Sequence, residues 1–250
     1  MKYIFLDTET GGLDPSKNAL LTVGMVVQGD DGDILGTLHL NIHPEDFIVE
    51  ADALLINKIN MMDHLEKALS RKDAARSISA WVSHYFGEKK PHVVGHNTSF
   101  DLGFLDQLFR ETNTPIPYSY RSLDTMGNAL FIKSLGVSVG DKLGLEALMS
   151  FYGIHLPDHE TLHNALTDAK MTRLVFLAQQ SQLSSLLSKN PLRWVLNFFK
   201  KGGSHNTSCL KCALKDDELI RYKTALGGIA QSVHYGDSQI AKQALGLISK

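Results

Sequence analysis

The first 42 residues contain three apolar runs separated by turn-forming residues, and this pattern constrains the fold more than any other feature. The runs occupy residues 2–6, 20–27 and 34–42, and β-branched side chains are frequent in them. Runs of this length, with Gly and Asp between the second and the third, predict β-strands. We therefore expect the chain to begin with a three-stranded antiparallel meander.

After the meander, helical and extended patterns alternate. Apolar residues recur at helical spacing within residues 52–86, and residues 92–95 form a short apolar run. A helical pattern follows Phe100, residues 120–125 read as a last strand, and residues 143–152 and 165–180 are again helical. This order predicts an α/β domain with a mixed five-stranded sheet flanked by helices.

The composition is that of a globular protein, with 43 % apolar and 21 % charged residues among 250. No run approaches the roughly 20 apolar residues that a membrane helix needs, so we expect no membrane association. The N-terminus shows no secretory signal pattern. Two cysteines cannot build a disulfide framework, and we expect the chain to be cytoplasmic.

Charge divides the chain into two parts. Residues 1–182 contain 15 Lys and Arg against 23 Asp and Glu, whereas residues 183–250 contain 10 against 4. A Ser-rich stretch ending at Pro191 lies near the change, and residues 200–208 have the composition of a flexible linker. We expect a catalytic or binding domain over 1–182 and a small, basic, mostly helical extension over 183–250.

Asp7 and Glu9 directly follow the first apolar run. Side chains two apart in a strand share a face, so these two carboxylates project together if the strand reaches Glu9. Neighbouring carboxylates repel each other, and a divalent cation such as Mg²⁺ or Mn²⁺ removes the repulsion. The alternative is a pair of solvated acids at an exposed strand end.

Two later segments carry acids of the same kind. Asp101 lies at the start of the helix that follows residues 92–95, where it could equally complement the helix dipole. His163 precedes Asp168 by five residues, with the small Ala165 between them. If His163 lies just before a helix, both side chains can face one cleft; the alternative is two unrelated surface residues.

Together, these segments resemble the DEDDh exonucleases, the DnaQ-like family with a ribonuclease H-like fold. The first family motif matches at Asp7, Glu9 and Thr10. The second matches at Asn97, Phe100 and Asp101, and the third at His163, Ala165 and Asp168. The segment Leu123-Asp124-Thr125 also resembles a recurring part of the family. The resemblance covers residues 1 to about 180.

The resemblance implies a metal-dependent 3′–5′ exonuclease that releases nucleoside 5′-monophosphates. Two Mg²⁺ or Mn²⁺ ions would be held by four carboxylates: Asp7, Glu9, Asp101 and Asp168. His163 would be the general base. We expect the substrate to be the 3′ end of single-stranded or frayed DNA, in proofreading or repair. The alternatives are an exoribonuclease and a non-catalytic module that binds nucleic acid or a polymerase.

The resemblance also suggests residues that contact the substrate: Thr10, Gly11, Gly12, Leu13, Asn97 and Phe100. Each has a structural alternative, since the glycines suit a plain turn, Asn97 a helix cap and Phe100 the core. The chain departs from the family at Gly11, where a second threonine is more common. It departs again at Asn57, which replaces a histidine of the family's segment for the terminal nucleotide.

The basic residues of 183–250 suggest contact with nucleic acid, and this segment could also bind a DNA polymerase or another replication protein. His205, Cys209 and Cys212 have a spacing that zinc sites use, although a fourth ligand is not evident. Free thiols are the alternative.

Overall fold

The computed structural model describes residues 2–158 and 160–189. The segment Met1–Leu186 forms one compact unit. Most of the predicted extension, including the linker at 200–208 and the candidate zinc ligands, lies outside the described residues. The division of the chain at residue 182 therefore stays a prediction. Among the described helices, none is both long and apolar enough to cross a membrane.

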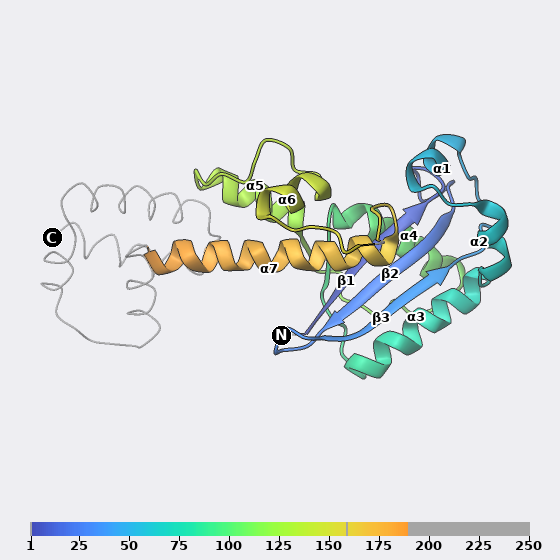
Figure 1. Cartoon of the computed structure of the whole chain (residues 1–250). Helices are drawn as coiled ribbons and strands as arrows, with labels where there is room; N and C mark the ends of the chain where they lie inside the picture. Colours follow the sequence, from blue (N-terminus) through green and yellow to red (C-terminus); the bar gives the residue numbers. More distant parts are fainter. Residues whose placement is uncertain (1, 159, 190–250) are drawn as a thin grey trace, which may run out of the picture. The chain divides into compact units, whose positions relative to one another are not determined.

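A mixed five-stranded sheet of order β3-β2-β1-β4-β5 forms the centre of this unit (Figure 1). β1 (Tyr3–Thr10), β2 (Leu20–Gln28) and β3 (Ile34–Asn41) pair in antiparallel fashion. β4 (Val93–Gly95) and β5 (Ser122–Asp124) continue the sheet parallel to β1. The predicted meander and the mixed sheet are confirmed, and β1 is the central strand.

Seven helices accompany the sheet in the described part of the chain. They are α1 (Ala51–Asn57), α2 (Met61–Lys67), α3 (Arg71–Phe86), α4 (Thr98–Glu111), α5 (Thr125–Ser134), α6 (Leu145–Tyr152) and α7 (Ala165–Lys189). The region 52–86, whose sequence has a helical pattern, thus forms three separate helices. α5 was not expected, and α7 runs past residue 180, where its pattern appeared to end.

The breaks within 51–86 have local causes. Lys58 ends α1 in the left-handed conformation, with φ of 57°. Asn60 and Ser70 then start the next two helices, because their side chains accept hydrogen bonds from the amides of Met62 and Asp73. Helical periodicity alone does not reveal such breaks, since the apolar spacing continues across them.

Different helices cover the two faces of β1. Phe5 packs with Ala169 and Phe176 of α7. Ile4 and Leu6, which point the other way, belong to the cluster that includes residues of α3 and α4. Because side chains alternate along a strand, the odd-numbered residues of β1 face α7 and the even-numbered residues face α4. This alternation decides where the acids of the first motif point.

α7 also packs with α5 and α6 in a separate apolar cluster, to which it contributes Met171 and Val175 (Figure 1). Polar contacts join these helices: Gln179 Nε2 donates to the Thr125 carbonyl at 2.8 Å, and Tyr152 Oη donates to Gln182 Oε1 at 2.7 Å. These contacts explain why α7 continues through the Ser-rich stretch, because tertiary packing stabilises a helix that its composition does not favour.

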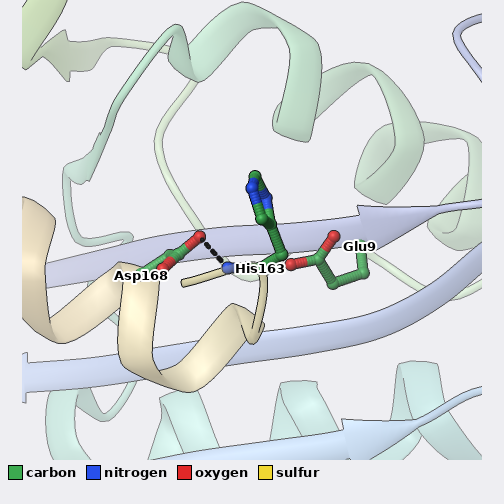
Figure 2. Close-up of side chains that lie close together, drawn as sticks. All are labelled: Glu9, His163 and Asp168. Carbon is green, nitrogen blue, oxygen red and sulfur yellow. Dashed lines mark hydrogen bonds between the residues drawn. The ribbon is translucent and has the colours of Figure 1, made fainter. Parts of the chain in front are cut away.

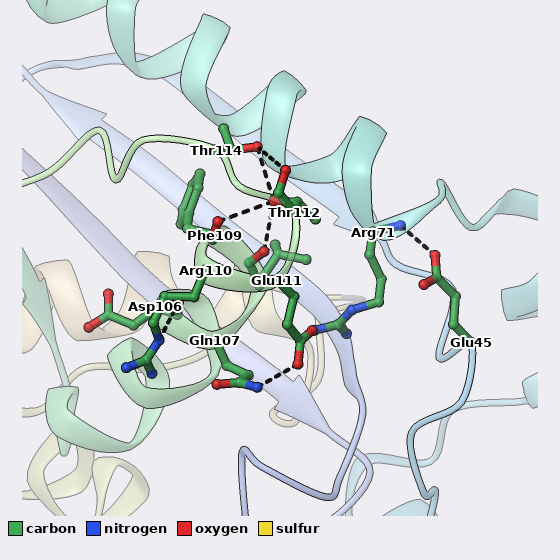
Figure 3. A network of polar contacts seen from close by, with 10 residues as sticks. Glu45, Arg71, Asp106, Gln107, Phe109, Arg110, Glu111, Thr112 and Thr114 are labelled. Atoms are coloured by element: carbon green, nitrogen blue, oxygen red, sulfur yellow. Dashed lines mark hydrogen bonds and ion pairs between the residues drawn. The ribbon is translucent and has the colours of Figure 1, made fainter.

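A buried arginine ties α3 to α4. The Arg71 guanidinium donates to Glu111 Oε2 at 2.7 Å and lies 4.2 Å from the centre of the Phe47 ring. The Arg71 amide, at the start of α3, donates to Glu45 Oε1 (Figure 3). The network fixes the first turn of one helix against the last turn of the other.

Candidate active site

The acids of the three motifs gather at one edge of the sheet. β1, β4 and β5 are parallel, so their carboxyl ends meet at the same edge. Asp7 and Glu9 lie near that end of β1, and Asp101 follows β4 in the first turn of α4. Because β1 continues to Thr10, Asp7 and Glu9 share the face that α7 covers, as the alternation predicted.

Glu9, His163 and Asp168 form the tightest group at this edge (Figure 2). One carboxylate oxygen or ring nitrogen of each lies within 4.8 Å of those of the other two. His163 has a φ of 65°, and its backbone amide donates to Asp168 Oδ2 at 3.1 Å. The two carboxylates are buried, whereas the imidazole is exposed. His163 is thus held by its backbone while its ring remains accessible.

The electrostatics show that Asp7 and Asp101 belong to the same group. Burial raises the pKa of Asp7 well above its ordinary value, and the charges of Asp101, Asp168 and Glu9 raise it further. Burial likewise raises the pKa of Glu9 to about 8, with added repulsion from Asp168 and Asp101. Four carboxylates are therefore close enough to oppose one another's ionisation.

The two remaining acids are also affected chiefly by loss of water. Burial raises the pKa of Asp101 to about 7, and hydrogen bonds from Thr8 lower it in part. Burial raises the pKa of Asp168 to about 6, against the effect of the His163 amide. In the folded protein without a cation, these carboxylates are held in an environment that disfavours their charge.

A divalent cation fits this donor set. The oxygen atom Oδ1 of Asp168 is buried and has no hydrogen-bond partner in the described structure. Within the described residues, no Lys or Arg forms an ion pair with any of the four acids. Hard divalent cations take carboxylate oxygens as ligands and would neutralise the repulsion. As far as the structure describes the chain, these acids therefore lack a Lys or Arg counter-charge of the kind that a purely structural acid cluster requires.

A family model described as an exonuclease matches residues 4–176, which include all three motifs. The chain belongs to the exonuclease family. The DnaQ-like 3′–5′ exonuclease predicted from the motifs is thereby confirmed, together with its ribonuclease H-like fold. Exonucleases of this family use divalent metals, and the donor set of this site fits such an ion.

Relatives of this exonuclease include ribonuclease T of Buchnera aphidicola subsp. Acyrthosiphon pisum, which is 30 % identical over 186 residues. That alignment covers 69 % of this chain and 79 % of the relative. The DNA polymerase III subunit epsilon of the same organism is 29 % identical over 204 residues, which cover 79 % of this chain and 80 % of the relative.

Among solved structures, the exonuclease is similar to E. coli exonuclease I in complex with a dT13 oligonucleotide. The TM-score is 0.59 at 20 % sequence identity, and the match covers 86 % of this chain. It covers 46 % of exonuclease I, so this chain spans less than half of that protein. At this identity, the likeness shows the shared fold.

The turn after Glu9 uses most of its polar groups internally. Thr10 Oγ1 donates to the Gly12 carbonyl at 2.7 Å, and the Gly11 amide donates to the Ala19 carbonyl at 2.7 Å. Gly11 and Gly12 are closely approached by Ile48 and Asn18, respectively. The glycines therefore allow a compact turn, and Leu13, which is 81 % exposed, is its outward-pointing side chain.

The other predicted substrate contacts differ in accessibility. Asn97 is exposed and occupies the N-cap position of α4 with a φ of 61°, as the capping interpretation placed it, but its side chain makes no capping hydrogen bond. Phe100 is half-buried, packs against the core and lies 5.1 Å from the Phe104 ring. Asn57 is buried: its amide donates to the Thr10 carbonyl at 3.2 Å, and it accepts from the Ile59 amide.

Two residues at this edge, Thr8 and Gly24, were not singled out in the sequence, and a third, Asp124, was noted only as part of a family segment. Thr8 donates to Asp101, Gly24 lies beside Asp7 on β2, and Asp124 accepts hydrogen bonds from both α4 and α5. Strand periodicity places Thr8 opposite its acidic neighbours, and Asp124 ends a predicted strand. Their partners, however, are distant in sequence, and no local pattern identifies them.

Proposed function

We propose that this exonuclease removes nucleotides one at a time from the 3′ ends of single-stranded or frayed DNA, in proofreading or repair, and releases nucleoside 5′-monophosphates. The observation that carries the proposal is the convergence of Glu9, Asp168 and the accessible His163 beside Asp7 and Asp101. A non-catalytic binding module would have no need to keep four mutually repelling acids out of water.

Two Mg²⁺ or Mn²⁺ ions would be held by the carboxylates of Asp7, Glu9, Asp101 and Asp168. When bound, such ions lower the pKa of water and neutralise the charge that develops on the phosphate. The free oxygen Oδ1 of Asp168 and the absence of paired Lys or Arg among the described residues support this assignment.

His163 acts as the general base in this proposal. Its exposed imidazole accepts a proton from the attacking water, whose oxygen forms the new bond to phosphorus. The bond between phosphorus and the 3′ oxygen of the preceding sugar breaks, and that oxygen takes a proton from solvent. The bond from the His163 amide to Asp168 keeps the ring beside the carboxylates through this step.

Helix α1 is bonded to the turn that follows Glu9 and exposes apolar side chains. Both of its ends are bonded to the turn after Glu9: the Glu50 amide, just before α1, donates to the Gly11 carbonyl at 2.7 Å, and Asn57 donates to the Thr10 carbonyl. Leu55 and Ile56 on this short helix are 76 % and 59 % exposed. We infer that they and Leu13 contact the terminal base.

Support for DNA over RNA comes from the relatives. The polymerase III subunit epsilon aligns with 79 % of this chain, and the solved structure of exonuclease I holds a DNA strand. Ribonuclease T aligns with 69 % at similar identity, which keeps an exoribonuclease as the second candidate. No residue of the site distinguishes the two sugars by itself.

The deciding experiment is a time course on 5′-labelled DNA and RNA single strands, with Mg²⁺, Mn²⁺ or a chelator. We expect a ladder that shortens from the 3′ end, requires the cation and runs faster on DNA. Asp7→Ala should remove it while the protein stays folded. Faster shortening of RNA would favour the exoribonuclease, and turnover by folded Asp7→Ala would reject the assignment.

For partners, we propose that residues 183–250 bind nucleic acid and tether the enzyme to a DNA polymerase or replication protein. The support is their surplus of basic residues, 10 against 4, and the relatedness to a polymerase subunit. Capture of a purified polymerase by the full chain, but not by a chain ending at Lys189, would test the tether. Equal capture by both chains would contradict it.

A further inference from the structure

Thr8, between the two acids of the first motif, points to the opposite face of the sheet. Its hydroxyl donates to Asp101 Oδ1 at 2.7 Å, across 93 residues of sequence. Thr8 is 7 % exposed and Asp101 3 % exposed, so water does not compete for this bond. Among the described residues, Thr8 is the one side chain that donates a hydrogen bond to Asp101.

The donor is held rigidly. Thr8 lies in the central strand and pairs with Val23 of β2, and a β-branched side chain has restricted rotation about χ1. Asp101 lies within the buried stripe of α4, which begins at Thr98 and continues at Phe104, Leu105 and Leu108. The bond therefore links a fixed point of the sheet to a carboxylate whose helix is fixed by its own packing.

A carboxylate at a metal site has two oxygens, and a hydrogen bond to one of them orients the other. Thr8 holds Oδ1, so the plane of the Asp101 carboxylate is set before any ligand binds. One strand thus presents Asp7 and Glu9 on one face and orients Asp101 from the other.

We propose that Thr8 is a positioning residue that orients Asp101 for cation binding. This proposal rests on the proposed function, because it takes Asp101 as a ligand. Loss of such an outer hydrogen bond typically weakens metal affinity by about 10- to 100-fold. The expected defect is therefore in affinity for the cation, even when the protein is folded and no nucleic acid is present.

The test is calorimetric titration of the chelator-stripped full chain with Mn²⁺. Thr8→Val keeps the shape and removes the hydroxyl, and Thr8→Ala replaces it if the valine variant does not fold. Thr8→Ser restores the donor. Thr172→Val is the matched control, since Thr172 is buried like Thr8 but its hydroxyl has no hydrogen-bond partner among the described residues.

We expect Thr8→Val or Thr8→Ala to weaken Mn²⁺ binding by about 10- to 100-fold, with Thr8→Ser and Thr172→Val near the natural protein. A lower unfolding midpoint in chelator with unchanged Mn²⁺ affinity would overturn the proposal, because Thr8 would then be a structural tie only. The variant Asp101→Asn distinguishes the positioning role of Thr8 from the role of Asp101 as a cation ligand. If Asp101→Asn weakens Mn²⁺ binding and Thr8→Val does not, the positioning role of Thr8 is rejected while Asp101 remains a ligand. If Asp101→Asn binds Mn²⁺ normally, the assignment of Asp101 as a ligand in the proposed function is rejected as well.

Discussion

Each acid of the active site has a raised pKa chiefly because its carboxylate has been removed from water, and like charges raise the pKa further at Asp7, Glu9 and Asp101. A group whose pKa is higher in the folded than in the unfolded state binds more protons when folded. Between the two pKa values, raising the pH therefore weakens folding. For Glu9, this interval runs from 4.5 to about 8.

We predict that, in chelator, the free energy of unfolding falls as the pH rises from about 4.5 to 8, by on the order of a few kcal/mol. Saturating Mn²⁺ should restore most of the lost free energy of unfolding, because a cation bound to the folded state stabilises the charged carboxylates. Denaturant unfolding at several pH values, with and without Mn²⁺, measures both effects.

Glu9→Gln is the control for this prediction. The neutral amide removes one of the four charges, so the variant in chelator should lose less stability with rising pH than the natural protein. Mn²⁺ should stabilise the variant less. A natural protein whose stability in chelator is flat or rises over this pH range would contradict the repulsion described here.

At the scale of single residues, strand periodicity was sufficient to predict that Asp7 and Glu9 share a face. Alternation along a strand put both on one face, and the strand does reach Glu9. The same rule put Thr8 on the other face but did not reveal Asp101 as its partner, because the bond joins positions 93 residues apart. Only the packing of α4 on the sheet brings them together.

Among the elements, the position of α7 depends on a glycine. Gly24 is the cross-strand partner of Asp7. A Cβ at Gly24 would lie 2.2 Å from the carbonyl carbon and oxygen of Ala165, in the first turn of α7. The backbone of the helix thus rests directly on β2. This close approach brings Asp168 and His163 to the acids of β1.

We predict that Gly24→Ala pushes the start of α7 away from the sheet and slows turnover by about 100-fold, at a loss of about 1–3 kcal/mol in stability. Single-turnover degradation and thermal unfolding measure the two effects. Gly144→Ala is the control, since a Cβ at Gly144 meets nothing within 4 Å. Near-normal turnover by Gly24→Ala would mean that α7 adjusts without displacing its catalytic residues.

Asp124 joins the starts of two helices. Its carboxylate accepts hydrogen bonds from the amides of Asn97 and Thr98 before and within α4, and from those of Met126 and Gly127 in α5. It therefore holds the turn that leads to Asp101 against the end of β5. α5 itself escaped sequence analysis because its spacing is weakly amphipathic.

We predict that Asp124→Asn lowers stability by about 1–2 kcal/mol and turnover by about tenfold or more, because an amide nitrogen cannot accept from a backbone amide. Ser70→Ala removes the cap of α3, away from the acids, and should lower stability similarly while turnover stays normal. Chemical denaturation and the 3′-end degradation assay distinguish the two variants. Equal losses of activity in both would contradict a specific role for Asp124.

For the whole molecule, the acidic body and the basic C-terminal segment suggest separate contributions to substrate binding. α7 continues to Lys189, and Gln182 and Leu183 contact the compact unit. A truncation meant to remove the segment should therefore end at Lys189, because a cut at residue 182 would remove part of a packed helix.

We predict that a chain of residues 1–189 degrades short strands but binds single-stranded DNA more weakly at low salt, with a flatter dependence of affinity on salt. Fluorescence anisotropy over a salt series measures both, and activity on a short strand controls for folding. An unchanged affinity and salt slope would show that the basic residues serve another purpose.

The three-stranded start and the alternation of strands and helices that follows could be predicted from the sequence, because they depend on local periodicity that neighbouring residues carry. The residues of the three motifs were identified through their resemblance to a family. Three contacts became visible only in the folded chain: Thr8 bonds to Asp101, Gly24 leaves room for α7, and Asp124 joins α4 to α5. Each of these contacts links segments far apart in the chain, and its geometry exists only after the sheet and helices have packed.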